Sequence, residues 1–186
     1  LSNPDIVVPP GALDKLLELM RRDSQIGILG CRLQDPYGRT MGSCGSFPKP
    51  AALLLRSLGL DKILKISRRL RERLELDYFR FPERTSTVDV VIGAFVLVRR
   101  SALDRVGMLD EDFFLYGEDL DWCWRMGEWG WKVVHCPEVS VIHEQGVSAA
   151  LRPVRSLWHF HLAMYKFYDK HQKQQLPWGI RGIVPV

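Results

Sequence analysis

The run Val88–Arg99 constrains the fold more than any other stretch of the sequence. It reads Val-Asp-Val-Val-Ile-Gly-Ala-Phe-Val-Leu-Val-Arg, with nearly continuous apolar side chains. Such a run is typical of a strand buried on both faces at the centre of a sheet that helices cover. It therefore predicts a buried central strand. Gly93 and Ala94 interrupt the run, and glycine within a strand often marks a bulge or the close approach of a ligand.

Helical and strand-like segments surround this central run. Ala12–Arg22 carries apolar residues at helical spacing, Ile26–Leu33 resembles a strand, and Asp35–Gly38 is a turn signal. Further helices are expected over residues 51–76, 102–106, 118–129 and 152–170, and further strands over residues 39–43, 131–135 and 139–143. Cys136-Pro137 separates the last two strands, since proline donates no ladder hydrogen bond.

Composition limits the class of protein. The 186 residues are 46% hydrophobic and 26% charged, which is enough apolar material for one sizeable core. The net charge of +4 favours anionic partners such as phosphates or a membrane surface. The four cysteines form no C-x-x-C pair, which indicates reduced, buried thiols in a cytoplasmic setting. No apolar run reaches the length of a membrane span. We expect a cytoplasmic location with peripheral contact to the inner face of the plasma membrane.

The stretch Leu109–Arg125 combines acidic residues with large aromatic ones. Its six acids are Asp110, Glu111, Asp112, Glu118, Asp119 and Asp121. Carboxylates held against apolar rings tend to have raised pKa values, and that tunes a weak acid toward work as a base near neutral pH. A well-capped helix with an acidic first turn would explain the same residues without any catalytic role.

A helix that begins at Gly117 separates these acids by role. Asp121 and Arg125 then have the i,i+4 spacing of an ion pair, which we expect to be structural. Asp119 points to another side of the helix and has no obvious local partner. Asp119 is therefore the carboxylate most available for chemistry.

Two segments carry both apolar and basic residues. Residues 51–76 place leucines on one helical face and lysines or arginines on the other, which suits either an anionic membrane surface or a solvated helix packed by its leucines. Residues 152–170 are aromatic and basic, and we expect a core side and a membrane-interface side. The basic run lacks clustered aromatics, which argues against nucleic acid as a partner.

Four blocks in this order resemble the inverting glycosyltransferases of family 2, which have the GT-A fold, and most closely their rhamnosyltransferase-like branch in bacteria. The blocks are Asn3–Asp5, Val91–Arg100, Val106–Arg125 and Pro137–His143. The resemblance implies a Rossmann-like α/β domain with a mixed central sheet flanked by helices. Residues 1–150 would form its acceptor- and metal-binding part, and residues 151–186 a C-terminal aromatic and basic helix with a tail.

The family also carries a nucleotide-binding half before its D-x-D motif. Asn3-Pro4-Asp5 stands at the place of that motif, with Asn3 in place of its first acid. The resemblance therefore implies that this chain is the C-terminal part of a catalytic domain without the nucleotide-binding half. Such a part can be inactive by itself, and its exposed strand edges can lead to oligomers.

The resemblance implies a role for each matching residue. Asp119 would be the general base, with Glu118 beside it in the family's E-D motif. Asp5 and His143 would bind the Mg²⁺ or Mn²⁺ that holds the donor diphosphate. The residues implied for donor and acceptor binding are Asn3, Gly93, Ala94, Asp110, Tyr116, Asp121, Trp122 and Arg125.

The implied activity is inverting transfer of a sugar, with rhamnose as one candidate. The donor would be a nucleotide-diphosphate sugar, and the acceptor a hydroxyl of a cell-envelope glycan or a lipid-linked molecule. Two alternatives stay open at this point. One is a metal-dependent phosphoester hydrolase that uses the same carboxylates, and the other is a non-catalytic module that binds a membrane or anions.

Overall fold

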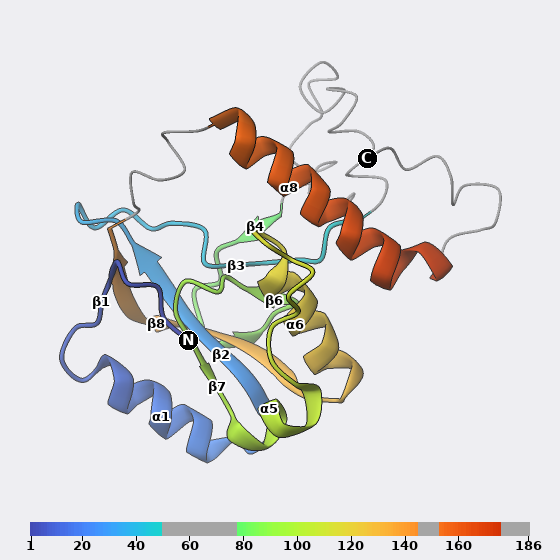
Figure 1. Ribbon diagram of the computed structural model, residues 1–186. Coiled ribbons are helices and arrows are strands. Elements are labelled where there is room, and N and C mark those ends of the chain that lie inside the picture. Colours follow the sequence, from blue (N-terminus) through green and yellow to red (C-terminus); the bar gives the residue numbers. More distant parts are fainter. Residues whose placement is uncertain (50–77, 145–152, 176–186) are drawn as a thin grey trace.

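The computed structural model describes residues 1–49, 78–144 and 153–175, and its centre is a mixed β-sheet (Figure 1). The strand order is β1–β8–β2–β7, and β5 also pairs with β8. The bounds are Ile6–Val7 for β1, Ile26–Gln34 for β2, Ser86–Thr87 for β5, Val96–Val98 for β7 and Lys132–His143 for β8. Strands β2 and β8 run parallel, whereas the other pairs are antiparallel. The expected mixed central sheet is confirmed.

A second, smaller sheet has the strand order β4–β3–β6. Its strands are Cys44–Gly45 for β3, Phe79–Arg80 for β4 and Val90–Val91 for β6. Both neighbours pair antiparallel with β3. The basic segment expected at residues 51–76 lies between β3 and β4 in sequence and outside the described residues.

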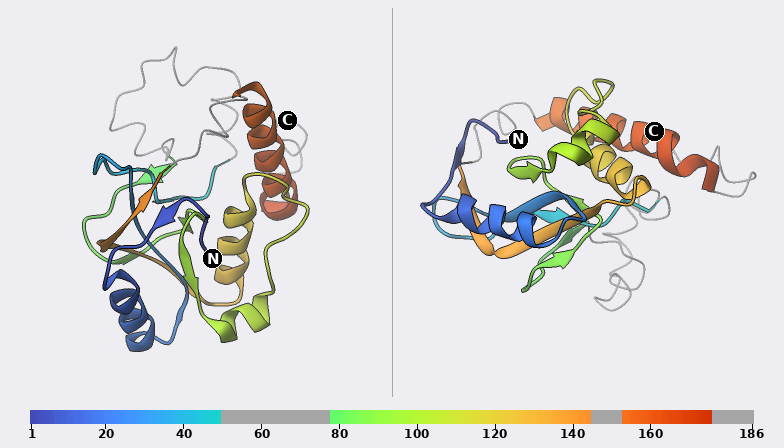
Figure 2. Two further views of the ribbon diagram at one scale, coloured as in Figure 1. Left: turned by 60° about the vertical axis from the view of Figure 1, so that its left-hand side comes forward. Right: turned by 90° about the horizontal axis from the view of Figure 1, so that it is seen from below.

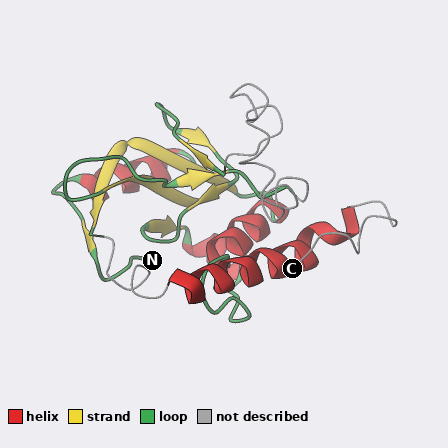
Figure 3. Cartoon of the chain, turned by 90° about the horizontal axis from the view of Figure 1, so that it is seen from above, coloured by secondary structure: helices red, strands yellow, loops and turns green. Residues whose placement is uncertain are grey.

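Helices cover both faces of the central sheet (Figures 1 and 2). Helix α1 spans Ala12–Arg22, α5 spans Arg100–Val106, α6 spans Glu118–Glu128, and α8 spans Pro153–Phe167. A π-helical turn at Tyr168–Gln172 and a 3-10 turn at Lys173–Gln175 extend α8. Figure 3 shows α8 running alongside α6 at the edge of the molecule. In the part of the chain that the structure describes, no helix is long and apolar enough to cross a bilayer.

The two faces of the sheet form two hydrophobic clusters. Neighbouring residues on a strand point to opposite faces. Ile28 and Val133 therefore join the cluster under α6, whereas Leu29 and Val134 join the cluster under α1. The central position of β2 and β8 explains why most of their residues are buried.

The prediction of one continuous strand over Val88–Arg99 is wrong. The run divides into β6 and β7, which belong to different sheets. Between them, the Ile92 N–H donates to the Ser43 carbonyl at 2.9 Å, and the Ala94 carbonyl accepts from the Asn3 N–H at 2.8 Å. The chain thus changes sheets at Gly93 and Ala94, where minimal side chains allow the turn.

Two further strand predictions need correction. Residues 131–135 and 139–143 form one strand, β8, and the register along β2 jumps from the pair Cys31–Cys136 to the pair Arg32–Ser140. Pro137 is tolerated there because bulged residues need not donate to the ladder. The return strand expected at residues 39–43 is reduced to a bridge between Gln34 and Thr40.

All four cysteines are free and buried, as the sequence predicts. Burial raises the thiol pKa of Cys31 to about 12 and that of Cys44 to about 11. These thiols therefore stay protonated near neutral pH, which suits packing rather than nucleophilic chemistry.

Candidate active site

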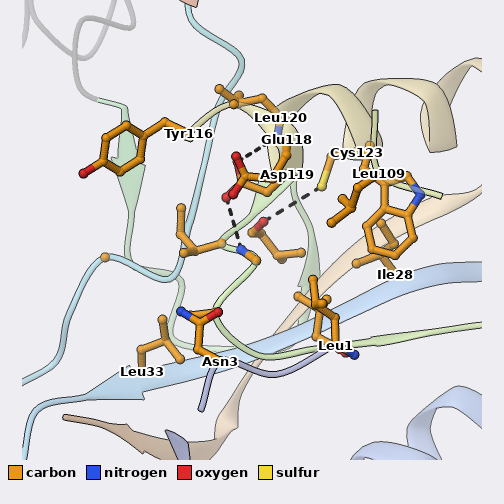
Figure 4. A pocket seen from close by; sticks show the side chains of 18 of the residues that line it. Leu1, Asn3, Ile28, Leu33, Leu109, Tyr116, Glu118, Asp119, Leu120 and Cys123 are labelled. Carbon is orange, nitrogen blue, oxygen red and sulfur yellow. Dashed lines mark hydrogen bonds between the residues drawn. The ribbon is translucent and has the colours of Figure 1, made fainter. Parts of the chain in front are cut away.

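A cavity of about 590 Å³ lies at the N-terminal end of α6 (Figure 4). Eight of the residues predicted for the site line it: Asn3, Gly93, Ala94, Tyr116, Glu118, Asp119, Trp122 and His143. Most of the other lining residues are apolar, and they come from β2, β4, β6, β7, α6, α8 and the loops between these elements. A largely apolar cavity with a few convergent polar groups is the usual form of a small-molecule site.

The two residues before α6 direct its first turn into the cavity. Tyr116 and Gly117 have φ values of 68° and 83°, so both adopt the left-handed conformation. A Cβ at position 117 would lie 3.0 Å from the Phe113 side chain and 3.1 Å from Ala163, so glycine fits both the backbone and the space. The helix then begins at Glu118, where acids are favoured by the helix dipole.

Asp119 is held by two backbone N–H groups. Its Oδ2 accepts from the Gly93 N–H at 3.1 Å, and its Oδ1 accepts from the Leu120 N–H at 2.8 Å (Figure 4). Burial raises the pKa of Asp119, and these hydrogen bonds oppose the rise only in part. A carboxylate with a fixed orientation and a raised pKa has the properties of a general base.

Gly93 is expected to be sensitive to the addition of a single methyl group. A Cβ at this position would lie 3.3 Å from the Asp119 Cβ, which is closer than an ordinary contact. We expect Gly93→Ala to displace the carboxylate and to lower turnover by about tenfold, because misplacing a catalytic group is costly. The measurement is kcat in the donor assay described below.

Gly127→Ala is the matched control for this prediction. Gly127 lies within α6, and a Cβ there would meet nothing within 4 Å. Alanine is the better helix former, so the control should keep its rate and gain slightly in stability. Equal kcat values for the two variants would contradict the proposed coupling between Gly93 and Asp119.

Glu118 also faces the cavity, with a buried carboxylate oxygen. Within the described residues, its Oε2 has no hydrogen-bond partner. Burial first, and the charge of Asp119 second, raise the pKa of Glu118. Buried polar atoms are nearly always paired in folded proteins, so this oxygen is suited to a hydroxyl of a bound ligand.

Asp5 and His143 lie side by side at the edge of the sheet. The register of β1 and β8 pairs Ile6 with His143, and the Glu144 N–H donates to the Asp5 carbonyl at 3.0 Å. As a result, the Asp5 Oδ2 and the His143 Nε2 are 3.4 Å apart. His143 lines the cavity, so the pair stands at its boundary.

This pair fits a divalent ion in part. No group of three or more potential ligand side chains occurs among residues 1–49, 78–144 and 153–175. Mg²⁺ commonly binds proteins through one or two carboxylates and takes its other ligands from substrate phosphates and water. Asp5 and His143 are therefore suited to an ion that the substrate helps to hold.

Asp110, Asp121 and Arg125 do not line the cavity. Asp121 is fully buried and contacts Arg125 Nε at 2.7 Å, Lys170 Nζ at 2.7 Å and His171 Nε2 at 2.8 Å. Lys170 also contacts Asp110. The expected i,i+4 pair of Asp121 and Arg125 is confirmed, and it belongs to a network that attaches the C-terminal segment to α6.

Burial by itself would raise the pKa of Asp121. Hydrogen bonds from His171, Lys170 and Arg125 outweigh that effect and lower the pKa well below its ordinary value. Asp121 is therefore ionised over the whole physiological range and is not available to accept a proton. This contrast with Asp119, two residues away, separates a structural acid from a candidate base.

Tyr78 is a cavity residue that sequence reasoning missed. Burial first, and the nearby charge of Asp119 second, raise its pKa well above the usual value. Its phenol is therefore neutral and can donate a hydrogen bond to a ligand. Tyr78 lies two residues after the 51–76 segment and is part of no recognisable motif, so the sequence contains no signal that could have identified it.

The charges around the cavity favour an uncharged ligand group. No lysine or arginine of the described residues lines it, whereas Glu118 and Asp119 do. A sugar ring offers hydroxyls to these carboxylates and an apolar face to the remaining wall.

Comparison with known proteins yields a family and several relatives. The profile described as glycosyltransferase-like family 2 matches residues 1–161. An N-acetylglucosaminyl-diphospho-decaprenol L-rhamnosyltransferase of Mycobacterium tuberculosis (strain CDC 1551 / Oshkosh) is 33% identical over 194 residues, covering 98% of this chain and 59% of the relative. The low-salt glycan biosynthesis hexosyltransferase Agl10 of Haloferax volcanii is 23% identical over 145 residues, covering 78% of this chain and 41% of the relative.

A shorter match is to a further rhamnosyltransferase. Rhamnosyltransferase WbbL of Escherichia coli (strain K12) is 38% identical over 58 residues, covering 31% of this chain and 22% of the relative. The chain thus spans about three fifths of the mycobacterial relative and smaller shares of the others. The four blocks that suggested the family all fall within the 161 residues that its profile matches. The chain belongs to glycosyltransferase-like family 2.

Proposed function

We propose that the protein containing this chain transfers a sugar from a nucleotide-diphosphate donor to an acceptor hydroxyl, with inversion at the anomeric carbon. The observation that carries the proposal is the state of Asp119. It lines the cavity, its pKa is raised by burial, and the Gly93 and Leu120 N–H groups fix its orientation. Family membership supports the same reaction class.

The reaction is a single displacement. The acceptor oxygen attacks the anomeric carbon, the bond from that carbon to the phosphate oxygen breaks, and the nucleoside diphosphate leaves with the electron pair. Asp119 takes the proton of the acceptor hydroxyl. Glu118 and Tyr78 orient hydroxyls of the bound sugar. The buried Oε2 of Glu118 accepts a hydrogen bond from one hydroxyl, and the neutral phenol of Tyr78 donates one to another.

A divalent ion would be held by Asp5 and His143, whose side chains are 3.4 Å apart. Bound there, Mg²⁺ or Mn²⁺ would stabilise the negative charge that develops on the leaving diphosphate. The ion would thus supply the positive charge for the diphosphate, which agrees with the absence of lysine and arginine from the described cavity lining.

Rhamnose is the donor sugar that we propose, and a polyprenyl diphosphate-linked sugar is the acceptor. The mycobacterial relative is named for both L-rhamnosyl transfer and a diphospho-decaprenol acceptor. The methyl group of a 6-deoxy sugar suits the apolar part of the cavity wall, to which Ile28, Leu33 and Met41 contribute. Such a reaction would take place in the cytoplasm, at the inner face of the plasma membrane.

The test is release of nucleoside diphosphate from a panel of nucleotide sugars by the full-length protein, with Mg²⁺, with Mn²⁺ and with EDTA. We expect turnover of one donor that EDTA abolishes. Asp5→Asn should raise the metal concentration needed for half-maximal rate by about tenfold or more. Asp14→Asn, at an exposed position of α1, is the control and should leave this value unchanged.

Other outcomes would favour the alternative functions. Release of phosphate from simple phosphoesters, with no dependence on an acceptor, would favour a metal-dependent hydrolase. No turnover of any donor with either a lipid-linked or a soluble acceptor would favour a binding module. EDTA-resistant transfer would remove Asp5 and His143 from the proposed ion site.

A further inference from the structure

A buried hydrogen bond joins the two sheets near the candidate base. The Ser43 Oγ lies 2.9 Å from the His135 Nε2, and both residues are almost completely buried. Ser43 directly precedes β3 of the smaller sheet, whereas His135 belongs to β8 of the central sheet. The contact therefore holds one sheet against the other through a directional bond.

The two sheets pack closely at this level. Side chains two residues apart on a strand share a face, so His135 points to the same side as Val133, which belongs to one hydrophobic cluster with Val91 of β6. The register partner of His135 on β2 is Gly30. A Cβ at position 30 would lie only 2.8 Å from the Val91 Cβ, so this glycine lets β6 lie directly on β2.

The ring of His135 is neutral near pH 7. Burial lowers the pKa of His135, the Cys31 backbone and the Glu138 charge oppose that effect in part, and the Arg32 charge adds to it. A neutral ring and a hydroxyl can pair in the interior without the cost of burying a charge. Removing either partner would leave the other unpaired.

Ser43 also holds the backbone segment that reaches the base. Its carbonyl accepts from the Ile92 N–H at 2.9 Å, just beyond the end of the ladder between β3 and β6. The next residue, Gly93, donates its N–H to the Asp119 Oδ2 at 3.1 Å (Figure 4). A continuous series of hydrogen bonds and one peptide unit thus runs from β8 to the carboxylate.

We propose that the hydrogen bond between Ser43 and His135 positions the Gly93 N–H, which in turn orients Asp119. A buried polar contact specifies one arrangement of the two sheets, whereas apolar contacts tolerate sliding. Ser43 and His135 are positioning residues, since neither of these two described residues lines the cavity. The proposal rests on the proposed function for the role of Asp119 as base, but the coupling itself is measured without turnover.

Ser43→Ala in the full-length protein tests this coupling. The substitution removes a hydroxyl and changes neither a charge nor the carbonyl that holds Ile92. We expect kcat to fall by about tenfold, with little change in the KM for the donor, because the base is held less precisely. The Gly93 N–H lowers the pKa of Asp119, so a looser bond should move the acid limb of the kcat profile to higher pH by about 0.5 unit.

A shift of this kind reports the backbone hydrogen bond. The titratable groups that face Asp119 are Glu118 and Cys123 on α6 and Tyr78 directly before β4, and Ser43→Ala leaves all of them in place. Carbon-13 NMR of the Asp119 carboxyl, identified by its absence in Asp119→Asn, measures the same pKa without donor or acceptor.

Ser46→Ala is the matched control. Ser46 lies in the same stretch, is 4% exposed like Ser43, and accepts a hydrogen bond from the Arg80 Nε through its hydroxyl. Its replacement should lower the free energy of unfolding to a similar extent. Both kcat and the pKa of Asp119 should stay at the parent values.

Two substitutions of His135 separate the hydrogen bond from the volume of the side chain. The amide of His135→Gln reaches nearly the place of the imidazole Nε2 and can still pair with Ser43, so we expect a rate within about twofold of the parent. His135→Leu has no polar side-chain atom and should reproduce Ser43→Ala. In the double variant no partner is left unpaired, so stability should recover relative to Ser43→Ala while the pKa of Asp119 stays shifted.

Several results would overturn the proposal. They are a parent-like kcat and Asp119 pKa in Ser43→Ala and His135→Leu, an equal shift in Ser46→Ala, and an equal loss of rate in His135→Gln and His135→Leu. Circular dichroism checks folding, and the double variant decides the question if a single variant is unfolded. If the parent transfers no sugar, a shifted Asp119 pKa in Ser43→Ala still supports the coupling and an unshifted one still overturns it, so the two failures are distinguishable.

Discussion

Replacing Asp119 by asparagine should lower the rate of nucleoside diphosphate release by roughly 10²–10⁴-fold, the usual contribution of a positioned base. Asparagine has nearly the same shape and can still accept a hydrogen bond from Gly93 or Leu120. It cannot take a proton from the acceptor. The loss should therefore appear in kcat, with little change in the KM for the donor.

The same substitution should not destabilise the fold. The folded-state pKa of Asp119 is raised by burial, so ionisation of this group costs stability as pH rises through the region between its unfolded and folded pKa values. At neutral pH the asparagine variant avoids that cost. Its free energy of unfolding, from urea titration, should equal or exceed that of the parent.

The pH dependence supplies an independent check. The rate of the parent should rise with pH through an ionisation that lies above the ordinary range of an aspartate, because only ionised Asp119 accepts the proton. Asp104→Asn, at an exposed position of α5, is the control and should keep both rate and profile. An unchanged kcat in Asp119→Asn, with a folded protein, would remove Asp119 as the base.

Local sequence patterns predicted the parts of the site that one element determines. Gly117 before a run of acids predicted the start of α6, and the i,i+4 spacing predicted the pair of Asp121 and Arg125. These features depend on residues within one or two helical turns. Periodicity likewise predicted α1 with its observed bounds.

Contacts between distant segments were outside the reach of such patterns. The N–H that holds Asp119 belongs to Gly93, 26 residues earlier, and its position depends on where the chain changes sheets. An apolar run looks the same whether it stays in one sheet or divides between two, so β6 and β7 were predicted as one strand. Proline marks a break in a ladder but does not say whether the strand resumes, which is why β8 was predicted as two.

Family resemblance supplied what patterns could not. It placed Asp5 and His143 together although 138 residues separate them, and the structure brings their side chains within 3.4 Å. It also assigned Asp110, Asp121 and Arg125 to ligand binding, whereas the described cavity lining does not include them. The partners of Asp121 on the C-terminal segment explain the difference, because Lys170 and His171 lie 49 and 50 residues away in sequence.

Replacing Asp121 by asparagine should lower the free energy of unfolding by about 3 kcal/mol, at the lower end of the range for breaking a buried ion pair. The variant leaves the cations of Arg125 and Lys170 without their common anion. Lys170 keeps 38% exposure of its side chain, so water compensates part of the loss. For a chain of this size, the melting temperature should fall by roughly 6–12 °C.

Asp169→Asn is the matched control, because Asp169 lies on the same C-terminal segment and forms an i,i+4 pair with Lys173. Both partners of that pair are more than 40% exposed, so its removal should cost little. Equal losses of unfolding free energy in the two variants would show that the contribution of the Asp121 network to stability does not depend on the burial of Asp121.

Acid should reveal the origin of the Asp121 effect. Because the folded-state pKa of Asp121 is lowered, its contribution is fully present above the ordinary carboxyl value of 3.8 and is lost as pH falls below it. The difference in unfolding free energy between the parent and Asp121→Asn should therefore be constant near neutral pH and shrink in acid.

Since the same network attaches the end of α8 to α6, its loss should also loosen the contact between α8 and the loop that carries Tyr116 into the cavity. Turnover should then fall less than in Asp119→Asn and recover as temperature is lowered, which would separate an effect on position from an effect on chemistry.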